Sequence, residues 1–131
     1  MKIIIGEGSC GIAAGAAKIY DYFAKHTKFA ELSITGCIGM CYLEPIVDVI
    51  EEGKKRTYCK VGTDILPEFS KALEQKEFDG TLLKSLELKE EDRAFLEKQT
   101  RIALRNCGII NPESIEDYIR QLRYNLLCFQ G

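Results

Sequence analysis

The sequence predicts an α/β protein: a four-stranded mixed sheet with two packed helices, followed by a C-terminal pair of helices. In the first 76 residues, apolar segments of strand length alternate with segments whose apolar residues recur at helical spacing. Two of the strand-like segments flank Glu51-Glu52-Gly53-Lys54, which is typical of a hairpin turn and makes two of the strands antiparallel. With 131 residues, 46% of them hydrophobic, the chain is long enough to bury one core.

Residues 1–76 are expected to form one domain with the element order β-α-β-β-β-α. Strands are predicted over 2–5, 31–35, 46–50 and 57–61. A helix is expected from 11 to 26, and its apolar face consists of Ile12, Ala16, Ile19, Tyr20 and Phe23. Thr63 or Asp64 is suited to cap a second helix that runs to about residue 75.

The C-terminal part is expected to be organised differently. Residues 77–90 have mixed polarity and no clear period, which predicts a linker. The segment 91–131 is predicted to hold two helices, the first ending at Gly108. The second is expected to start at Asn111-Pro112-Glu113, with Asn111 as its cap, and to carry an apolar stripe from Ile115 to Phe129.

Charge and cysteine content narrow the class of protein. The net charge of −2 gives no basic field that would favour nucleic acid. The opening run Ile3-Ile4-Ile5 is far too short for a signal peptide or a membrane span, so a cytoplasmic, reducing location is expected. In such a location, six cysteines indicate metal binding or catalysis before disulfides.

Three of the cysteines lie in glycine-containing loops. Cys37 and Cys41 are separated by three residues, and glycine lets such a loop take positive φ and approach a metal closely. Cys10 follows the first strand, near a helix N-terminus, where the thiolate form is favoured. Thiolates suit iron–sulfur clusters, copper(I) or zinc, so these three residues are the candidate ligands. The alternative is that they are small buried side chains.

The remaining cysteines are Cys59, Cys107 and Cys128. They fall on an expected strand and two expected helices, and we predict that they are buried thiols without a role in metal binding.

The pattern Gly6-x-Gly8-x-x-Gly11 matches the dinucleotide-binding fingerprint, since it follows a strand and precedes a helix. That fingerprint needs an acidic residue at the end of the second strand, about 20 positions further on. Here the second strand ends in Ser33-Ile34-Thr35-Gly36, without an acid. We therefore interpret the glycines as allowing a tight turn beside Cys10.

Two separated motifs resemble a known family. They read Gly8-Ser9-Cys10-Gly11-Ile12-Ala13-Ala14-Gly15-Ala16 and Thr35-Gly36-Cys37-Ile38-Gly39-Met40-Cys41-Tyr42-Leu43-Glu44-Pro45. Both are similar to the N-terminal thioredoxin-like 2Fe–2S ferredoxin domain of the NADH-oxidising, FMN-carrying subunit of complex I-like enzymes and NAD(P)-linked multimeric hydrogenases. Residues 98–118 also resemble the start of the flavin domain in that subunit.

This resemblance implies a thioredoxin-like domain over 1–76 that holds a 2Fe–2S cluster and relays electrons to or from a flavoprotein. It implies that Cys10, Cys37 and Cys41 ligate the cluster, and that the cysteine loop is shaped by Gly36, Gly39 and Pro45. The implied partners are the other subunits of an oxidoreductase complex. Self-association through the C-terminal apolar stripe is a further expectation, because large exposed apolar patches mark partner surfaces.

The chain departs from the family in two respects. The usual first ligand stands five residues before the second, and here that position is Ile5, which cannot ligate. The glycine-rich FMN and NADH site of the family has no counterpart in these 131 residues, so the chain by itself is not expected to oxidise NADH.

Cys59 is the alternative for the fourth ligand. Pairing across the hairpin places it roughly opposite Ile46, but strand spacing puts it about 10 Å from the position of Ile5. The sequence therefore favours an incomplete or labile cluster site. Two other interpretations stay open: a cluster-free module that docks onto a partner subunit, and a module stabilised by zinc on the same thiolates.

Overall fold

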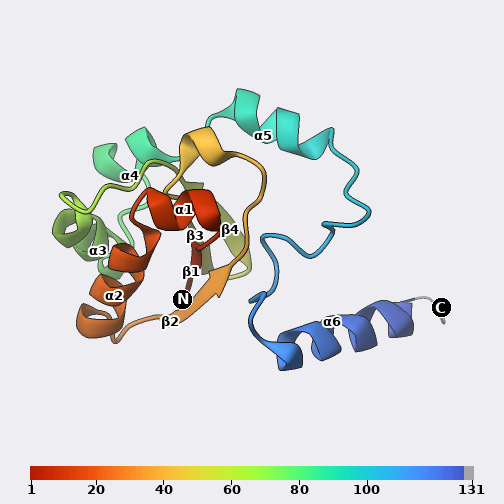
Figure 1. Ribbon diagram of the computed structural model, residues 1–131. Helices are drawn as coiled ribbons and strands as arrows, with labels where there is room; N and C mark the ends of the chain where they lie inside the picture. Colours follow the sequence, from red (N-terminus) through yellow and green to blue (C-terminus); the bar gives the residue numbers. More distant parts are fainter. Residues whose placement is uncertain (129–131) are drawn as a thin grey trace.

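The structure is a computed structural model that describes residues 1–128. The elements are β1 (Lys2–Gly6), α1 (Ser9–Ala13), α2 (Ala16–His26), β2 (Glu31–Thr35), the 3-10 turn η1 (Cys41–Leu43), β3 (Val47–Glu51), β4 (Lys54–Tyr58), α3 (Leu66–Glu74), α4 (Thr81–Leu86), α5 (Glu90–Glu97) and α6 (Ile115–Cys128). Figure 1 shows their arrangement. Among the described residues, no helix combines the length and the apolarity that crossing a membrane requires.

The sheet has four strands in the order β2-β1-β3-β4. β1 pairs in parallel with β2 and antiparallel with β3, and β3 pairs antiparallel with β4. In the register of β1 and β3, Ile5 lies opposite Val47 and Ile3 opposite Val49. This mixed sheet with packed helices is the fold class that the sequence predicts.

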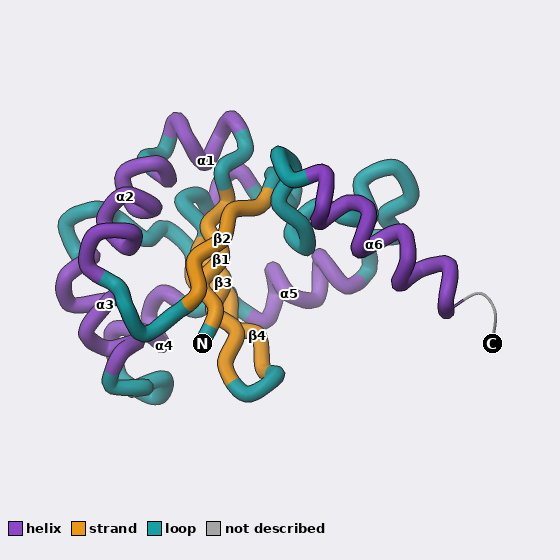
Figure 2. The backbone as a smooth tube through the Cα atoms, turned by 90° about the horizontal axis from the view of Figure 1, so that it is seen from below, coloured by secondary structure: helices purple, strands orange, loops and turns teal. Residues whose placement is uncertain are grey.

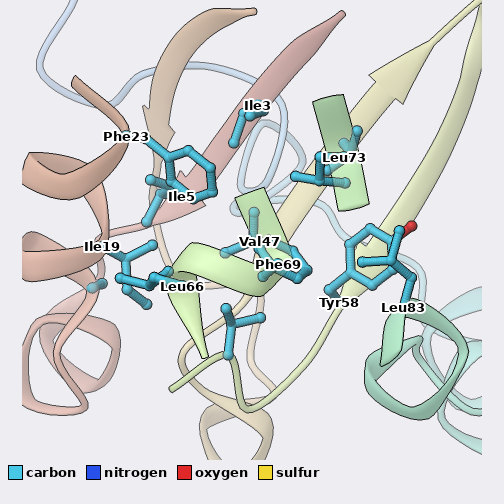
Figure 3. Packing of buried hydrophobic residues seen from close by; sticks show 13 residues of the cluster. Ile3, Ile5, Ile19, Phe23, Val47, Tyr58, Leu66, Phe69, Leu73 and Leu83 are labelled. Carbon is cyan, nitrogen blue, oxygen red and sulfur yellow. The ribbon is translucent and has the colours of Figure 1, made fainter. Parts of the chain in front are cut away.

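The main core fills the space between one face of the sheet and the helices α2, α3 and α4, which lie together on that side in two views (Figures 1 and 2). Aromatic side chains occupy its centre: the rings of Tyr58 and Phe69 meet edge to face with centroids 5.3 Å apart. The fully buried side chains in this cluster include eight that Figure 3 labels: Ile3, Ile5, Ile19, Phe23, Val47, Phe69, Leu73 and Leu83. The opposite side of the sheet carries α5 and the chain leading to α6 (Figure 2).

The helix expected over 11–26 is divided into α1 and α2. Gly15 separates them with a φ of +104°, a backbone conformation that glycine adopts at little cost. Because the break redirects α1, Ile12 leaves the apolar face and is 53% exposed. Ile19 and Phe23, on α2, are buried as expected.

The hairpin is tighter than expected, and its second strand lies three residues earlier than predicted. Glu52 and Gly53 both have positive φ, as in a type I′ turn, so pairing resumes at once between Glu51 and Lys54. The ladder ends at the pair Val47 and Tyr58. Cys59, predicted to lie roughly opposite Ile46, therefore falls one residue beyond the ladder, and its N–H donates to the carbonyl of Leu86 at 2.8 Å.

The segment 77–90, predicted to be a linker, contains helix α4 and the start of α5. Leu83 of α4 is fully buried in the main core, and Glu87 forms an isolated bridge with Tyr58 at the edge strand β4. The linker prediction is wrong for this stretch, because a helix too short to show a clear period still supplies one core side chain.

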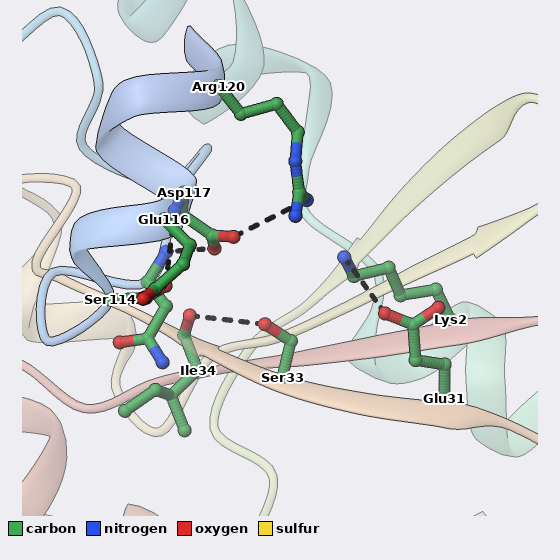
Figure 4. Close-up of polar contacts among 9 residues, drawn as sticks. Lys2, Glu31, Ser33, Ile34, Ser114, Glu116, Asp117 and Arg120 are labelled. Atoms are coloured by element: carbon green, nitrogen blue, oxygen red, sulfur yellow. Dashed lines mark hydrogen bonds and ion pairs between the residues drawn. The ribbon is translucent and has the colours of Figure 1, made fainter.

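The C-terminal helices also differ from the prediction. The helix expected over 91–107 is limited to α5, and Gly108 lies in a later turn with a φ of +81°. The second helix starts at Ile115 instead of Pro112. Ser114 caps it: the Ser114 hydroxyl accepts a hydrogen bond from the Asp117 N–H, and the Asp117 carboxylate accepts one from the Asn111 N–H (Figure 4).

Part of the apolar stripe can be compared with the structure. The side chains of Ile115, Tyr118 and Ile119 are exposed. Phe129, the last residue of the expected stripe, lies outside the described residues.

Candidate metal centre

Cys37 and Cys41 form the centre of the candidate site. Their sulfur atoms lie 3.6 Å apart. Two thiolates bound tetrahedrally to one metal at about 2.3 Å would lie about 3.8 Å apart, so this pair has the spacing of two ligands of one metal ion. The donor set therefore fits one side of a metal or iron–sulfur centre.

The turn between the two cysteines explains this spacing. Gly39 has a φ of +89° and donates its N–H to the Cys37 sulfur at 3.3 Å. Cys41 opens the 3-10 turn η1, in which the Leu43 N–H donates to the carbonyl of Met40 at 2.9 Å. The backbone thus turns both thiols toward each other, and Gly39 lies at this turn.

The surroundings of Cys37 shift the pKa of its thiol in opposite directions. The Gly39 N–H lowers its pKa, but burial and the neighbouring Cys41 raise it, and the net effect is a raised pKa. Without a metal, the Cys37 thiol therefore holds its proton. Binding of a metal ion would have to displace that proton, as is general for thiolate ligands.

Cys10 is exposed on α1. Gly8 brings α1 and the cysteine loop together: a Cβ atom on Gly8 would lie 2.7 Å from the Cβ of Cys37 and 2.9 Å from its backbone nitrogen. Within the described residues, however, no group of three or more Cys, His, Asp or Glu side chains is arranged to hold a metal ion. The structure thus brings Cys37 and Cys41 together and leaves Cys10 on the neighbouring element.

Gly11 allows another close approach, because a Cβ atom there would lie 2.2 Å from the carbonyl oxygen of Gly6. The Glu44 carboxylate lies beside both glycines and accepts a hydrogen bond from the Ile46 N–H at 2.9 Å. Burial raises the pKa of Glu44, although the Ile46 N–H partly opposes this. The close approach of Gly11 to Gly6 lies within the turn beside Cys10 that the sequence interpretation expected, and Gly8 adds a contact with Cys37 that it did not include.

Pro45 and Gly36, the other two residues expected to shape the loop, differ in the contacts they make. The peptide bond between Glu44 and Pro45 is cis, and the Pro45 carbonyl accepts a hydrogen bond from Val61 at 3.1 Å, which ties the loop to the chain after β4. A Cβ atom on Gly36 would meet only Pro112, at an ordinary contact distance of 3.9 Å. The role of Gly36 stays a prediction.

Cys59 lies in a separate apolar cluster with Met40, Leu43, Ile46 and Leu88. Its thiol is buried, and burial raises its pKa to about 11. A thiol in this environment is protonated at neutral pH and packs as a small apolar group.

Cys107 is half-buried on a turn, not on the expected helix. The side chain of Cys128 lies outside the described residues.

The segment after α4 contacts the cysteine loop at three points, which sequence patterns did not indicate. The Tyr42 hydroxyl donates to the Asp92 carboxylate of α5 at 2.5 Å, and this bond raises the pKa of Tyr42. The Thr35 hydroxyl donates to the carbonyl of Ile110 at 3.0 Å. Between them, the Arg101 guanidinium donates to the carbonyl of Ile38.

Comparison with known proteins supports the fold. No protein-family model matches the chain, and no curated protein matches its sequence. The chain has a thioredoxin-like fold. Among solved structures, it is similar to a cysteine-to-serine variant of the thioredoxin-like [2Fe-2S] ferredoxin from Aquifex aeolicus, with a TM-score of 0.52 and 15% sequence identity. The match covers 68% of this chain and 98% of the ferredoxin.

Proposed function

We propose that the chain is an electron-transfer module that holds a 2Fe–2S cluster and belongs to an NADH-linked, multi-subunit oxidoreductase. The observation that carries this proposal is the pair of sulfur atoms of Cys37 and Cys41, 3.6 Å apart on a loop turned by Gly39. Support also comes from the fold, which is similar to that of a [2Fe-2S] ferredoxin. When bound, such a cluster would supply one-electron transfer.

Three thiols would hold the cluster: Cys37, Cys41 and Cys10. The first two come from one loop, and Cys10 comes from the helix that packs beside this loop through Gly8. The Gly39 N–H would remain as a hydrogen-bond donor to the Cys37 sulfur, and such hydrogen bonds tune the reduction potential of iron–sulfur centres. Cys10 and Cys41 are exposed, so the site lies at the surface, where an electron partner can approach.

The proposed site is incomplete within this chain, because 2Fe–2S clusters normally take four ligands. Ile5 occupies the position of the usual first ligand and is fully buried in the main core. Cys59 belongs to an apolar cluster, and the burial that raises its pKa to about 11 disfavours the thiolate that a metal needs. We propose a labile cluster with three protein thiolates.

The proposed partners are other subunits of the oxidoreductase, in particular a flavoprotein that exchanges electrons with the cluster. In this proposal the module works in the cytoplasm. NADH alone would not reduce it, because the hydride-accepting flavin belongs to the partner.

The test is anaerobic reconstitution with iron and sulfide, followed by a visible spectrum and an assay for iron, sulfide and zinc. Cys10→Ser, Cys37→Ser and Cys41→Ser should each lower the iron content severely, whereas Cys59→Ser, Cys107→Ser and Cys128→Ser should not. If Cys59→Ser abolishes the cluster as completely as Cys37→Ser, Cys59 is the fourth ligand and our assignment is wrong.

Two other results would replace the proposal. Zinc without sulfide would indicate a zinc-stabilised module, for which the spacing of Cys37 and Cys41 is equally suitable. A protein that takes up neither iron nor zinc would be a cluster-free docking module.

A further inference from the structure

Arg101 contacts the cysteine loop between its two cysteines. Arg101 donates one hydrogen bond from Nη2 to the carbonyl of Ile38, the residue directly after Cys37. Its Nη1 lies 3.4 Å from the carbonyl of Cys107 and donates to it as well. One planar guanidinium therefore joins the cysteine loop to the 101–107 turn.

The backbone around this contact is shaped for a close fit. A Cβ atom on Gly108 would lie 2.7 Å from the Cγ2 of Ile38, and Gly108 also has a φ of +81°, which glycine adopts most easily. The Ile38 side chain thus packs directly on the backbone that follows the carbonyl held by Arg101. The close packing of Ile38 on Gly108 and the two hydrogen bonds of Arg101 together fix the cysteine loop against the 101–108 segment.

The two other hydrogen bonds from the C-terminal segment lie on either side of this contact. Thr35, which is buried at the end of β2, donates to Ile110, and Tyr42 in η1 donates to Asp92. These bonds hold the loop where it leaves β2 and in η1. Among the described residues, the bond from Arg101 to the Ile38 carbonyl is the hydrogen bond that joins the C-terminal segment to residues 36–41.

We propose that Arg101 is a positioning residue for the candidate metal centre: it fixes the carbonyl of Ile38, and thereby holds the turn that sets Cys37 and Cys41 at ligand spacing. A hydrogen bond from a charged donor is stronger than a neutral one. Its positive charge, held at the carbonyl of the residue that follows Cys37, would also stabilise a reduced cluster over an oxidised one. The part of this inference that concerns a cluster rests on the proposed function, and the part that concerns the loop does not.

The loop part is tested on metal-free protein by amide hydrogen exchange. Three amides report on the turn: those of Gly39, Leu43 and Glu44, which donate to Cys37, Met40 and Cys41 respectively. Arg101→Gln should accelerate their exchange about tenfold or more, since the loss of a charged hydrogen bond shifts the opening equilibrium by that order. The β1–β3 ladder is the internal control, and its exchange should not change.

Two further variants make the comparison specific. Arg105→Gln removes the same charge from an exposed arginine of the same segment and should leave loop exchange unchanged. Arg101→Lys keeps the positive charge but loses the planar pair of N–H donors, so the loop amides should exchange at a rate between those of the parent and Arg101→Gln. If Arg101→Gln does not fold, this lysine variant decides the question. Loop exchange indistinguishable from the parent in a folded Arg101 variant would overturn the inference.

The cluster part is tested on reconstituted protein. Arg101→Gln should lose iron to a chelator about tenfold faster than the parent, and its midpoint potential should shift to more negative values. Arg101→Lys should restore most of the potential, whereas a purely structural role would not distinguish charge-keeping from charge-removing variants. A potential unchanged by Arg101→Gln would contradict the cluster part. If the parent itself takes up no iron, the proposed function fails, and the exchange experiment still decides the role of Arg101.

Discussion

Ile5 lies directly opposite Val47 in the β1–β3 ladder, and both side chains are fully buried (Figure 3). They pack into the core formed with α2 and α3. The position that would carry the first ligand in the family that the sequence resembles therefore points into the hydrophobic core of this protein. Ile5 thus contributes to the packing of the core, and this position supplies no ligand.

The first prediction concerns this position. Ile5→Cys should cost about 1–3 kcal/mol of stability, because it removes buried methyl groups from a filled site, and it should not increase the iron content after reconstitution. Denaturant unfolding and an iron assay check both statements. Ile5→Val is the matched control, with an expected cost of about 0.5–1.5 kcal/mol. A marked gain of iron in Ile5→Cys would show that β1 moves to present a ligand.

The second prediction concerns the thiol of Cys59. Burial raises its pKa from the ordinary 9.0 to about 11, so at pH 8 its thiolate fraction is about 100-fold lower than in the unfolded chain. Alkylation of Cys59 in the native protein should be slower by at least that factor, while the exposed Cys10 and Cys41 react quickly. Peptide mapping by mass spectrometry after timed alkylation measures each rate, with denatured protein as the reference.

The same shift predicts a dependence of stability on pH. Between pH 9 and about pH 11 the folded protein keeps the Cys59 proton that the unfolded chain releases, so the free energy of unfolding should fall as pH rises through this window. In Cys59→Ala that part of the fall should be absent. An equal fall in both proteins would mean that other groups cause it.

The third prediction compares two glycines. A Cβ atom on Gly8 would lie 2.7 Å from the Cβ of Cys37, whereas one on Gly36 would meet only Pro112 at 3.9 Å. Gly8→Ala should therefore push the cysteine loop away from α1, lower stability by about 1–3 kcal/mol and reduce iron retention. Gly36→Ala is the comparison: it adds only an ordinary contact and should cost little stability, and its effect on iron retention tests the predicted role of Gly36. If the two variants behave alike, the contact between Gly8 and Cys37 does not shape the site.

Much of this arrangement could be predicted from the sequence, because it depends on local patterns. Alternation and spacing indicated four strands, the last of them three residues too late, and the buried positions Ile19 and Phe23 of α2. The glycines around Cys10 indicated a tight turn. The hairpin turn was placed correctly, at Glu52 and Gly53. These features depend on residues close in the chain, whose spacing carries the information.

The contacts of the C-terminal segment could not be predicted in this way. Arg101 lies in a stretch that was expected to be helical but forms turns, and it meets the carbonyl of Ile38 across 63 positions of sequence. Every residue has a backbone carbonyl, so the sequence does not indicate which carbonyl will accept a hydrogen bond. The same holds for the burial of Leu83, whose short helix is too brief to show a period.

The fourth prediction concerns the Glu51 carboxylate. It forms ion pairs with Lys76 and with the amino group of Met1, and these contacts lower its pKa below the ordinary 4.5. A lowered carboxyl pKa contributes stability above about pH 4.5, and this contribution is lost as pH falls through the folded value. Glu51→Gln should therefore lower the melting temperature at pH 7, and the difference from the parent should shrink toward zero at strongly acid pH.

Lys76→Gln provides a check on the cause, since it removes one of the two partners of Glu51. It should reproduce part of the loss at pH 7. A difference between Glu51→Gln and the parent that persists unchanged to strongly acid pH would exclude the ion pairs as its origin.

The last prediction concerns helix α6, which projects away from the sheet in Figure 1. Ile115, Tyr118 and Ile119 are 61%, 46% and 46% exposed, and their spacing of three and four residues places them on one face of the helix. Burying an isoleucine side chain contributes about 1.5–3 kcal/mol, so pairing of this face with a second copy or with another subunit is favourable. We expect sedimentation of the isolated protein to show self-association that rises with concentration.

Replacing both isoleucines by glutamate should weaken this association about tenfold or more, because each change removes apolar area from the contact. Glu116→Gln is the control: it alters a neighbouring exposed residue of the same helix without touching the stripe. Sedimentation as a single monomeric species at high concentration, before any substitution, would show that this face does not pair with itself. The same face would then be open to a different subunit, and the doubly substituted protein should lose that partner while its loop and core keep their hydrogen exchange.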